Sequence, residues 1–152
     1  MKINTVGFVG TGVMGKSMIR HLLKKYNVVV YNRTKERALD LLEEGAIWAD
    51  TPTEVANQSD VVLTIVGYPK DVEEVYFGEQ GIFKSTKEHL VVVDLTTSTP
   101  TLAKRIAEEA TSRSWEALDA PVSGGDLGAK NGTLSTMVGG TEETLEKVYP
   151  VL

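Results

Sequence analysis

Gly10-Thr11-Gly12-Val13-Met14-Gly15 is a G-x-G-x-x-G stretch that follows an apolar run, Val6 to Val9, and precedes a segment with apolar residues at helical spacing. Glycines between a strand and a helix permit a tight turn, let a pyrophosphate approach the backbone and let the helix pack closely on the strand. Amides at the start of such a helix, together with its dipole, favour an anion. The stretch therefore predicts a dinucleotide-binding turn, with a plain structural turn as the alternative.

The rest of the chain alternates short β-branched runs with longer amphipathic segments, which is typical of βα units around a mostly parallel sheet. We expect strands at residues 6–9, 28–31, 47–49, 61–66, 90–95 and 115–119, and helices at 13–25, 35–44, 53–59, 71–76 and 100–113. Thr34 is expected to cap the second helix and Gly45 to end it. The tail, with a strand at 134–138 that could be antiparallel and a helix at 141–149, departs from the rhythm. The predicted fold class is α/β, a Rossmann-type doubly wound sheet in three layers.

Composition bounds the function. The 152 residues, 41% hydrophobic and 24% charged, suit one globular domain. A net charge of −5 gives no basic field for nucleic acid. The absence of cysteine and the presence of only two histidines, His21 and His89, argue against a metal site. No apolar run reaches the roughly 18 residues that span a membrane, so we expect a cytoplasmic protein.

A second motif overlaps the first. Gly10, Gly15, Lys16 and Ser17 also satisfy G-x-x-x-x-G-K-S, the phosphate loop of nucleoside triphosphatases. The run Val91 to Asp94 could pass for the strand that ends in a magnesium-binding Asp. Against this alternative stands Gly12, which the dinucleotide turn requires and the triphosphate loop does not. We therefore expect Lys16 and Ser17 to be ordinary helix residues.

The end of the second strand bears on the choice of cofactor. In dinucleotide folds an Asp or Glu about 20 residues beyond the glycines binds the ribose 2′-hydroxyl of NAD. Here the strand ends in Tyr31-Asn32-Arg33-Thr34, and Asn32 lies 17 positions after Gly15. A guanidinium in place of a carboxylate suits a 2′-phosphate. NADP is therefore favoured over NAD, while a solvated turn before the next helix is the alternative interpretation. Lys35 or Arg37 could also reach the phosphate in place of Arg33.

Two later stretches carry a family resemblance. They are Asp94-Leu95-Thr96-Thr97-Ser98-Thr99-Pro100 and Asp119-Ala120-Pro121-Val122-Ser123-Gly124-Gly125. With the glycine turn and the Asn-Arg-Thr triplet, they make the chain, from Val6 to its end, resemble the 3-hydroxyisobutyrate or β-hydroxyacid dehydrogenase family, relatives of 6-phosphogluconate dehydrogenase.

The resemblance implies roles for particular residues. It assigns the cofactor to Gly10, Thr11, Gly12, Val13, Met14, Gly15, Asn32, Arg33, Thr34, Val66, Gly67, Asp71 and Thr97. Within this set, Asp71 and Thr97 are expected at the nicotinamide side. Ser123, Gly124 and Gly125 match the loop that holds the substrate carboxylate, where small residues and free amides form an anion-binding concavity. No metal is implied.

The resemblance also implies that much of the enzyme is missing. Family enzymes continue beyond the point corresponding to Leu152 into an all-helical domain that supplies the catalytic Lys and packs against a partner subunit. We therefore expect residues 1–152 to be the NAD(P)-binding Rossmann domain alone, with no catalytic residue of its own. The intact enzyme, expected to be a homo-oligomer, would transfer hydride between NADP(H) and a small β-hydroxy acid or its semialdehyde or keto acid. A non-catalytic dinucleotide-binding module is the alternative.

Overall fold

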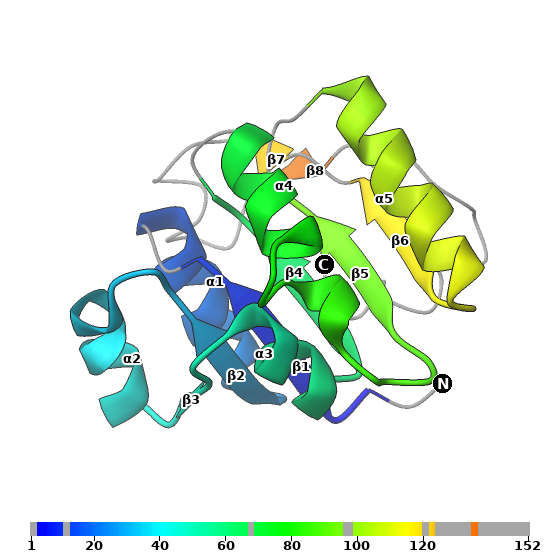
Figure 1. Cartoon of the computed structure of the whole chain (residues 1–152). Helices are drawn as coiled ribbons and strands as arrows, with labels where there is room; N and C mark the ends of the chain where they lie inside the picture. Colours follow the sequence, from blue (N-terminus) through cyan, green and yellow to red (C-terminus); the bar gives the residue numbers. More distant parts are fainter. Residues whose placement is uncertain are drawn as a thin grey trace.

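The sheet has the strand order of a dinucleotide-binding domain. The computed structural model describes residues 3–10, 13–66, 69–95, 99–119, 122–123 and 135–136. The strands of its main sheet are β1 (Thr5–Val9), β2 (Asn27–Tyr31), β3 (Ile47–Trp48), β4 (Val61–Thr64), β5 (Val91–Asp94) and β6 (Glu116–Asp119). They lie in the order β3-β2-β1-β4-β5-β6, with every neighbouring pair parallel (Figure 1). This order confirms the predicted Rossmann-type α/β sheet.

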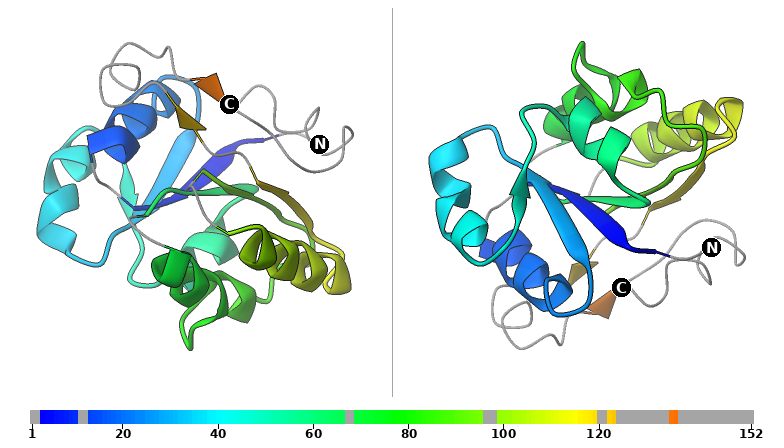
Figure 2. Two further views of the ribbon diagram at one scale, coloured as in Figure 1. Left: turned by 90° about the horizontal axis from the view of Figure 1, so that it is seen from above. Right: turned by 90° about the horizontal axis from the view of Figure 1, so that it is seen from below.

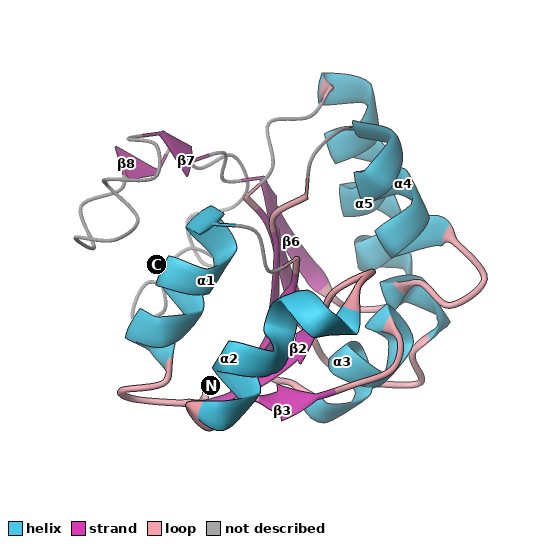
Figure 3. Cartoon of the chain, turned by 90° about the vertical axis from the view of Figure 1, so that its left-hand side faces the viewer, coloured by secondary structure: helices cyan, strands magenta, loops and turns pink. Residues whose placement is uncertain are grey.

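Helices cover both faces of the sheet. One face carries α1 (Val13–Leu22) and α2 (Leu39–Glu43), and the other carries α3 (Pro52–Gln58), α4 (Pro69–Phe77) and α5 (Pro100–Ser112), as Figures 2 and 3 show. Side chains of a strand point alternately to the two faces. Val28 and Val30 accordingly pack with the α1 side, while Val29 packs with the α3 side. Both faces of the inner strands are buried, which explains why their sequences are almost entirely apolar.

The core on the α3 side contains an aromatic cluster. The ring of Phe83 lies between those of Tyr76 and Trp115. Its centroid is 5.6 Å from the centroid of Tyr76, 5.7 Å from that of Trp115 and 5.1 Å from that of Phe77. These rings fill the space between α4, α5 and the short 3-10 helix η2 (Ile82–Lys84), which the sequence pattern did not predict.

No helix in the described part of the chain is long and apolar enough to cross a membrane.

The segment after β2 differs from the prediction. The expected helix at 35–44 consists of a 3-10 turn, η1 (Lys35–Ala38), followed by α2. Thr34 stands at the N-cap position, but its side chain makes no capping bond. Instead the Asn32 side-chain amide donates to the Thr34 carbonyl oxygen over 2.9 Å. The local turn thus forms through Asn32. Gly45 follows α2 with a φ of +111°, as its predicted role at the helix end requires.

The tail contains a short antiparallel pair. β7 (Val122–Ser123) pairs with β8 (Ser135–Thr136), and β8 lies inside the strand predicted at 134–138. The pairing is antiparallel, unlike that of the main sheet. The helix predicted at 141–149 lies outside the described residues.

Candidate functional site

The parallel strands end together at one edge of the sheet, here called the carboxyl edge. The strand order reverses between β1 and β4, because β2 lies on one side of β1 and β4 on the other. In open α/β sheets, ligands bind beyond the carboxyl ends of the strands at such a reversal. Gly10 follows β1, Asn32 follows β2, and Val66 comes two residues after β4. Three of the predicted cofactor residues therefore meet at this edge.

Gly10 occupies a position that only glycine fits. Its φ is +104°, and its amide donates to the Tyr31 carbonyl oxygen over 2.9 Å. A Cβ built on Gly10 would lie 2.0 Å from the carbonyl oxygen of Ile65 and 3.4 Å from Cγ1 of Val66. The turn after β1 is therefore pressed between the ends of β2 and β4, and Val66 borders it.

Gly15 lets α1 approach β1. A Cβ at Gly15 would lie 2.6 Å from the Gly10 carbonyl oxygen and 3.3 Å from Cε1 of Phe8. These two glycines meet two steric demands of a dinucleotide turn, because Gly10 permits the tight turn and Gly15 permits the close packing of α1 on β1. Thr11 and Gly12 lie outside the described residues. Val13 and Met14 form the first turn of α1, and only their backbone is described.

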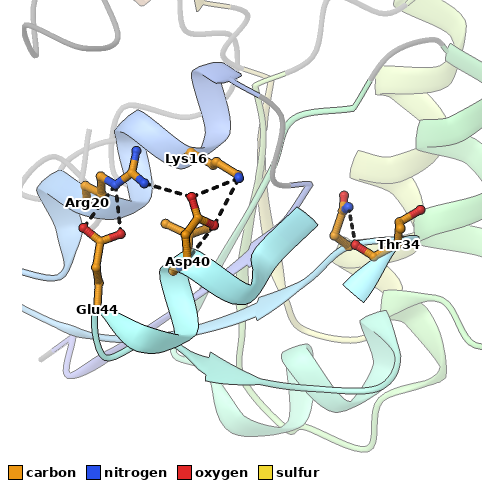
Figure 4. A network of polar contacts seen from close by, with 7 residues as sticks. Lys16, Arg20, Thr34, Asp40 and Glu44 are labelled. Carbon is orange, nitrogen blue, oxygen red and sulfur yellow. Dashed lines mark hydrogen bonds and ion pairs between the residues drawn. The ribbon is translucent and has the colours of Figure 1, made fainter. Parts of the chain in front are cut away.

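Lys16 joins α1 to α2. Its ammonium lies 3.1 Å from the Asp40 carboxylate, and Arg20 lies 3.0 Å from both Asp40 and Glu44 (Figure 4). The hydrogen bond from Lys16 lowers the pKa of the Asp40 carboxyl, and the hydrogen bond to Glu44 raises the pKa of Arg20. Ser17, the next residue in the motif, is buried in α1. The geometry favours the expectation that Lys16 and Ser17 are helix residues, since the ammonium points to α2.

Arg33 carries the positive charge after β2. Its side chain is 73% exposed, and its Nη2 lies 3.3 Å from Oδ1 of Asp71 and 3.5 Å from Oε2 of Glu74. Both carboxylates belong to α4, which follows β4. Because β1 lies between β2 and β4, these ion pairs join elements on either side of the turn at Gly10. The guanidinium is thus positioned at the carboxyl end of β2, the strand end that the sequence predicts to lie near the adenine ribose.

Asp71 lies beside Arg33. The resemblance assigns Asp71 to the nicotinamide side, and the strand-end argument assigns Arg33 to the adenine ribose. The two side chains are 3.3 Å apart, because the first turn of α4 lies beside the turn after β2. The place of Asp71 relative to a bound cofactor stays a prediction.

A buried polar group ties β4 to β5 below the same edge. The Thr64 hydroxyl lies 3.1 Å from the Tyr76 hydroxyl and donates to Oδ1 of Asp94 over 3.1 Å. All three residues are buried, and Tyr76 belongs to α4. The sequence analysis missed this group. Its signal was a polar residue at the last position of each of two otherwise apolar strands.

Several predicted site residues lie outside the described residues. Besides Thr11 and Gly12, these are Gly67, Thr97, Gly124 and Gly125. Ser123 lies in β7, and only its backbone is described. In the described part of the chain, no three His, Cys, Asp or Glu side chains gather in a way that could hold a metal ion.

Comparison with known proteins agrees with this geometry. Residues 5–152 match a family model described as the NAD binding domain of 6-phosphogluconate dehydrogenase. The uncharacterized oxidoreductase YkwC of Bacillus subtilis is 55% identical over 148 residues, which are 97% of this chain and 51% of that protein. A protein of Arabidopsis thaliana named probable 3-hydroxyisobutyrate dehydrogenase-like 1, mitochondrial, is 51% identical over 96% of this chain and 44% of its own length.

Solved structures share the fold. The structure described as Psf3 in complex with NADP+ and 2-OPP has a TM-score of 0.91 and 32% sequence identity, and the match covers 96% of this chain and 52% of that one. The chain spans about half the length of the curated relatives that it matches.

Proposed function

Since the chain belongs to the family of the NAD binding domain of 6-phosphogluconate dehydrogenase, we propose that it binds NADP(H) in preference to NAD(H) for an oxidoreductase. The substrate of that enzyme is a small β-hydroxy acid or the matching semialdehyde or keto acid. The observation that carries the cofactor preference is Arg33, which stands where an NAD-binding domain has a carboxylate, with its guanidinium held at the carboxyl edge.

In this proposal, different residues bind different parts of the cofactor. Gly10 permits the tight turn after β1 and Gly15 lets α1 pack against it, and the amides at the start of α1 are assigned to the diphosphate. Arg33 pairs with the 2′-phosphate, and the turn held by Asn32 and Thr34 sets the position of that side chain. When bound, the nicotinamide supplies the hydride acceptor or donor. Support for NADP also comes from the structural relative described with NADP+.

The substrate side of the proposal rests on the resemblance. Ser123, Gly124 and Gly125 are assigned to the substrate carboxylate, because small residues with free amides suit an anion. A Lys of the helical domain that the resemblance implies is assigned the proton transfer at the substrate oxygen. In this proposal residues 1–152 bind the cofactor but turn over substrate slowly by themselves.

The test is a titration of NADP and NAD against the wild type and the Arg33→Ala variant. A hydrogen bond to a charged group contributes about 1.5–3 kcal/mol, so the variant should lose roughly tenfold to a hundredfold in NADP affinity. Its affinity for NAD should change less than about threefold, since NAD has no phosphate at this position. Equal affinities of the wild type for both cofactors would refute the preference.

Arg37→Ala is the matched control. This substitution removes the same charge from an exposed position in η1, four residues further along the chain than Arg33. We expect this variant to keep its NADP affinity. A selective loss of NADP binding in Arg37→Ala, with none in Arg33→Ala, would assign the phosphate to η1 and contradict the role given to Arg33.

A further inference from the structure

Two carboxylates on α4 contact the same nitrogen of Arg33. Oδ1 of Asp71 lies 3.3 Å and Oε2 of Glu74 lies 3.5 Å from Nη2. Asp71 is the more enclosed of the two, with a side chain 17% exposed against 73% for Glu74. The three charged groups together carry a formal charge of −1, because two carboxylates face one guanidinium. The cation proposed to read the cofactor is thus more than neutralised before any cofactor binds.

A 2′-phosphate needs the same guanidinium atoms. Arginine binds a phosphate best through two parallel N–H bonds, for which the two Nη atoms or Nη2 with Nε would serve. Nη2 takes part in the ion pairs with both acids. A dianionic phosphate beside these carboxylates would also be repelled by them. The phosphate therefore competes with the carboxylates for Nη2, which donates a hydrogen bond to Asp71 and lies within ion-pair distance of Glu74.

Glu74 is the group that can leave. In the described part of the chain its carboxylate makes no other ion pair or hydrogen bond, and water can solvate it fully once it is released. The Asp71 side chain is only 17% exposed, so water would solvate its released carboxylate poorly, and its release costs more. The exchange of partners at Arg33 thus takes place between Glu74 and the phosphate.

We propose that Glu74 is a specificity-determining residue, whose carboxylate competes with the 2′-phosphate for Nη2 of Arg33. The inference rests on the proposed role of Arg33 in binding NADP. Glu74 lowers the affinity for NADP and leaves that for NAD unchanged, so it reduces the discrimination that Arg33 alone would produce.

The neighbouring residue provides a matched control. Glu73 is also exposed on α4, but its carboxylate turns to α5 and lies 3.2 Å from Nη1 of Arg105. Glu73→Gln and Glu74→Gln therefore remove the same charge from adjacent positions of one helix. Only Glu74→Gln removes a contact of Arg33.

The experiment measures NADP and NAD affinities of the wild type and both variants by isothermal titration calorimetry. We expect Glu74→Gln to bind NADP about twofold to fivefold more tightly at low ionic strength, the range that an exposed ion pair supports. The NAD affinity of Glu74→Gln, and both affinities of Glu73→Gln, should differ from those of the wild type by less than about 1.5-fold. The gain in NADP affinity of Glu74→Gln should shrink as the salt concentration approaches about 1 M, because salt screens the charges.

Three results would overturn the inference. Unchanged or weaker NADP binding in Glu74→Gln would mean that the carboxylate does not compete, and weaker NAD binding would mean that it holds the ribose instead. An equal gain in NADP affinity in Glu73→Gln would mean that the net charge of α4, and not the contact of Glu74 with Arg33, controls NADP binding.

The Arg33→Ala variant separates this failure from that of the proposed function. If Arg33→Ala loses NADP selectively while Glu74→Gln has no effect, the phosphate site stands and the competition is refuted. If Arg33→Ala has no effect, the proposed function fails first. With both correct, Glu74→Gln in the Arg33→Ala background should have no larger effect than Glu73→Gln.

Discussion

Gly15→Ala tests whether α1 must touch the turn after β1. The added Cβ would lie 2.6 Å from the Gly10 carbonyl oxygen, so the helix or the turn has to move by several tenths of an ångström. Overpacking of this kind costs about 1–3 kcal/mol, and alanine returns about 1 kcal/mol of helix propensity. We therefore expect a net loss of about 0–2 kcal/mol in the free energy of unfolding, a modest change.

The effect on binding should be larger than the effect on stability. A displaced helix start moves its amides away from the diphosphate, and each hydrogen bond to a charged group contributes about 1.5–3 kcal/mol. Loss of one such bond lowers NADP affinity by roughly tenfold or more. NAD should lose as much as NADP, because both cofactors carry the diphosphate.

Gly45→Ala is the control for this variant. Gly45 has a φ of +111°, and a Cβ there would meet no atom within 4 Å. Its cost is therefore that of a left-handed backbone alone, about 1–2 kcal/mol, and the position lies after α2, away from the carboxyl edge. The two variants should lose similar stability but differ in binding.

Urea unfolding and dinucleotide titration of both variants decide the matter. Gly15→Ala should be stable enough to titrate, with binding weakened for both cofactors. If Gly15→Ala bound with the affinity of the wild type, the close approach of α1 would have no part in holding the diphosphate. An equal loss in Gly45→Ala would attribute the weakening to general destabilisation.

Two further predictions concern the ion pairs of Figure 4. Lys16→Ala should keep its NADP affinity within about twofold of the wild type, because the ammonium pairs with Asp40. Calorimetry with ATP and magnesium should show no tight binding of ATP to the wild type. Magnesium-dependent ATP binding in the wild type that is lost in Lys16→Ala would contradict this prediction. Asp40→Asn should cost up to about 1 kcal/mol at pH 7, since both side chains are partly exposed. The hydrogen bond from Lys16 lowers the pKa of Asp40 in the folded protein, so this stability is present above the ordinary pKa of 3.8 and is lost as the pH falls through the lowered value. In urea unfolding, a difference between Asp40→Asn and the wild type that did not shrink as the pH was lowered below 3.8 would refute the assignment.

The strands of the main sheet could be predicted from sequence because burial on both faces selects long β-branched runs. Val28 to Val30 and Val91 to Val93 are such runs, and glycine or polar residues separate them from the helices. The cap of the second helix could not be predicted in the same way. Thr34 has the residue type of an N-cap, yet Asn32 makes the local bond, and sequence spacing allows either.

The candidate site was predictable in its residue types but not in its pairings. The glycines and Arg33 follow from local rules about turns and strand ends. The contact of Arg33 with Asp71 joins residues 38 positions apart, and the bond of Thr64 with Asp94 joins residues 30 positions apart. Such contacts depend on how α4 and β5 pack on the sheet, which no local pattern states.

The turn after β2 lies at the surface, whereas the strand before it is buried. Val28, Val29 and Val30 are buried, and Arg33 and Thr34 are exposed on a turn whose Thr34 carbonyl oxygen accepts bonds from the Asn32 side chain and the Arg37 amide. Ion pairs of an exposed side chain such as that of Arg33 contribute at most about 1 kcal/mol to stability. If Arg33 selects the cofactor as proposed, a lineage carrying this domain could exchange one dinucleotide for the other by a few mutations at the turn, without first acquiring a compensating change in the core.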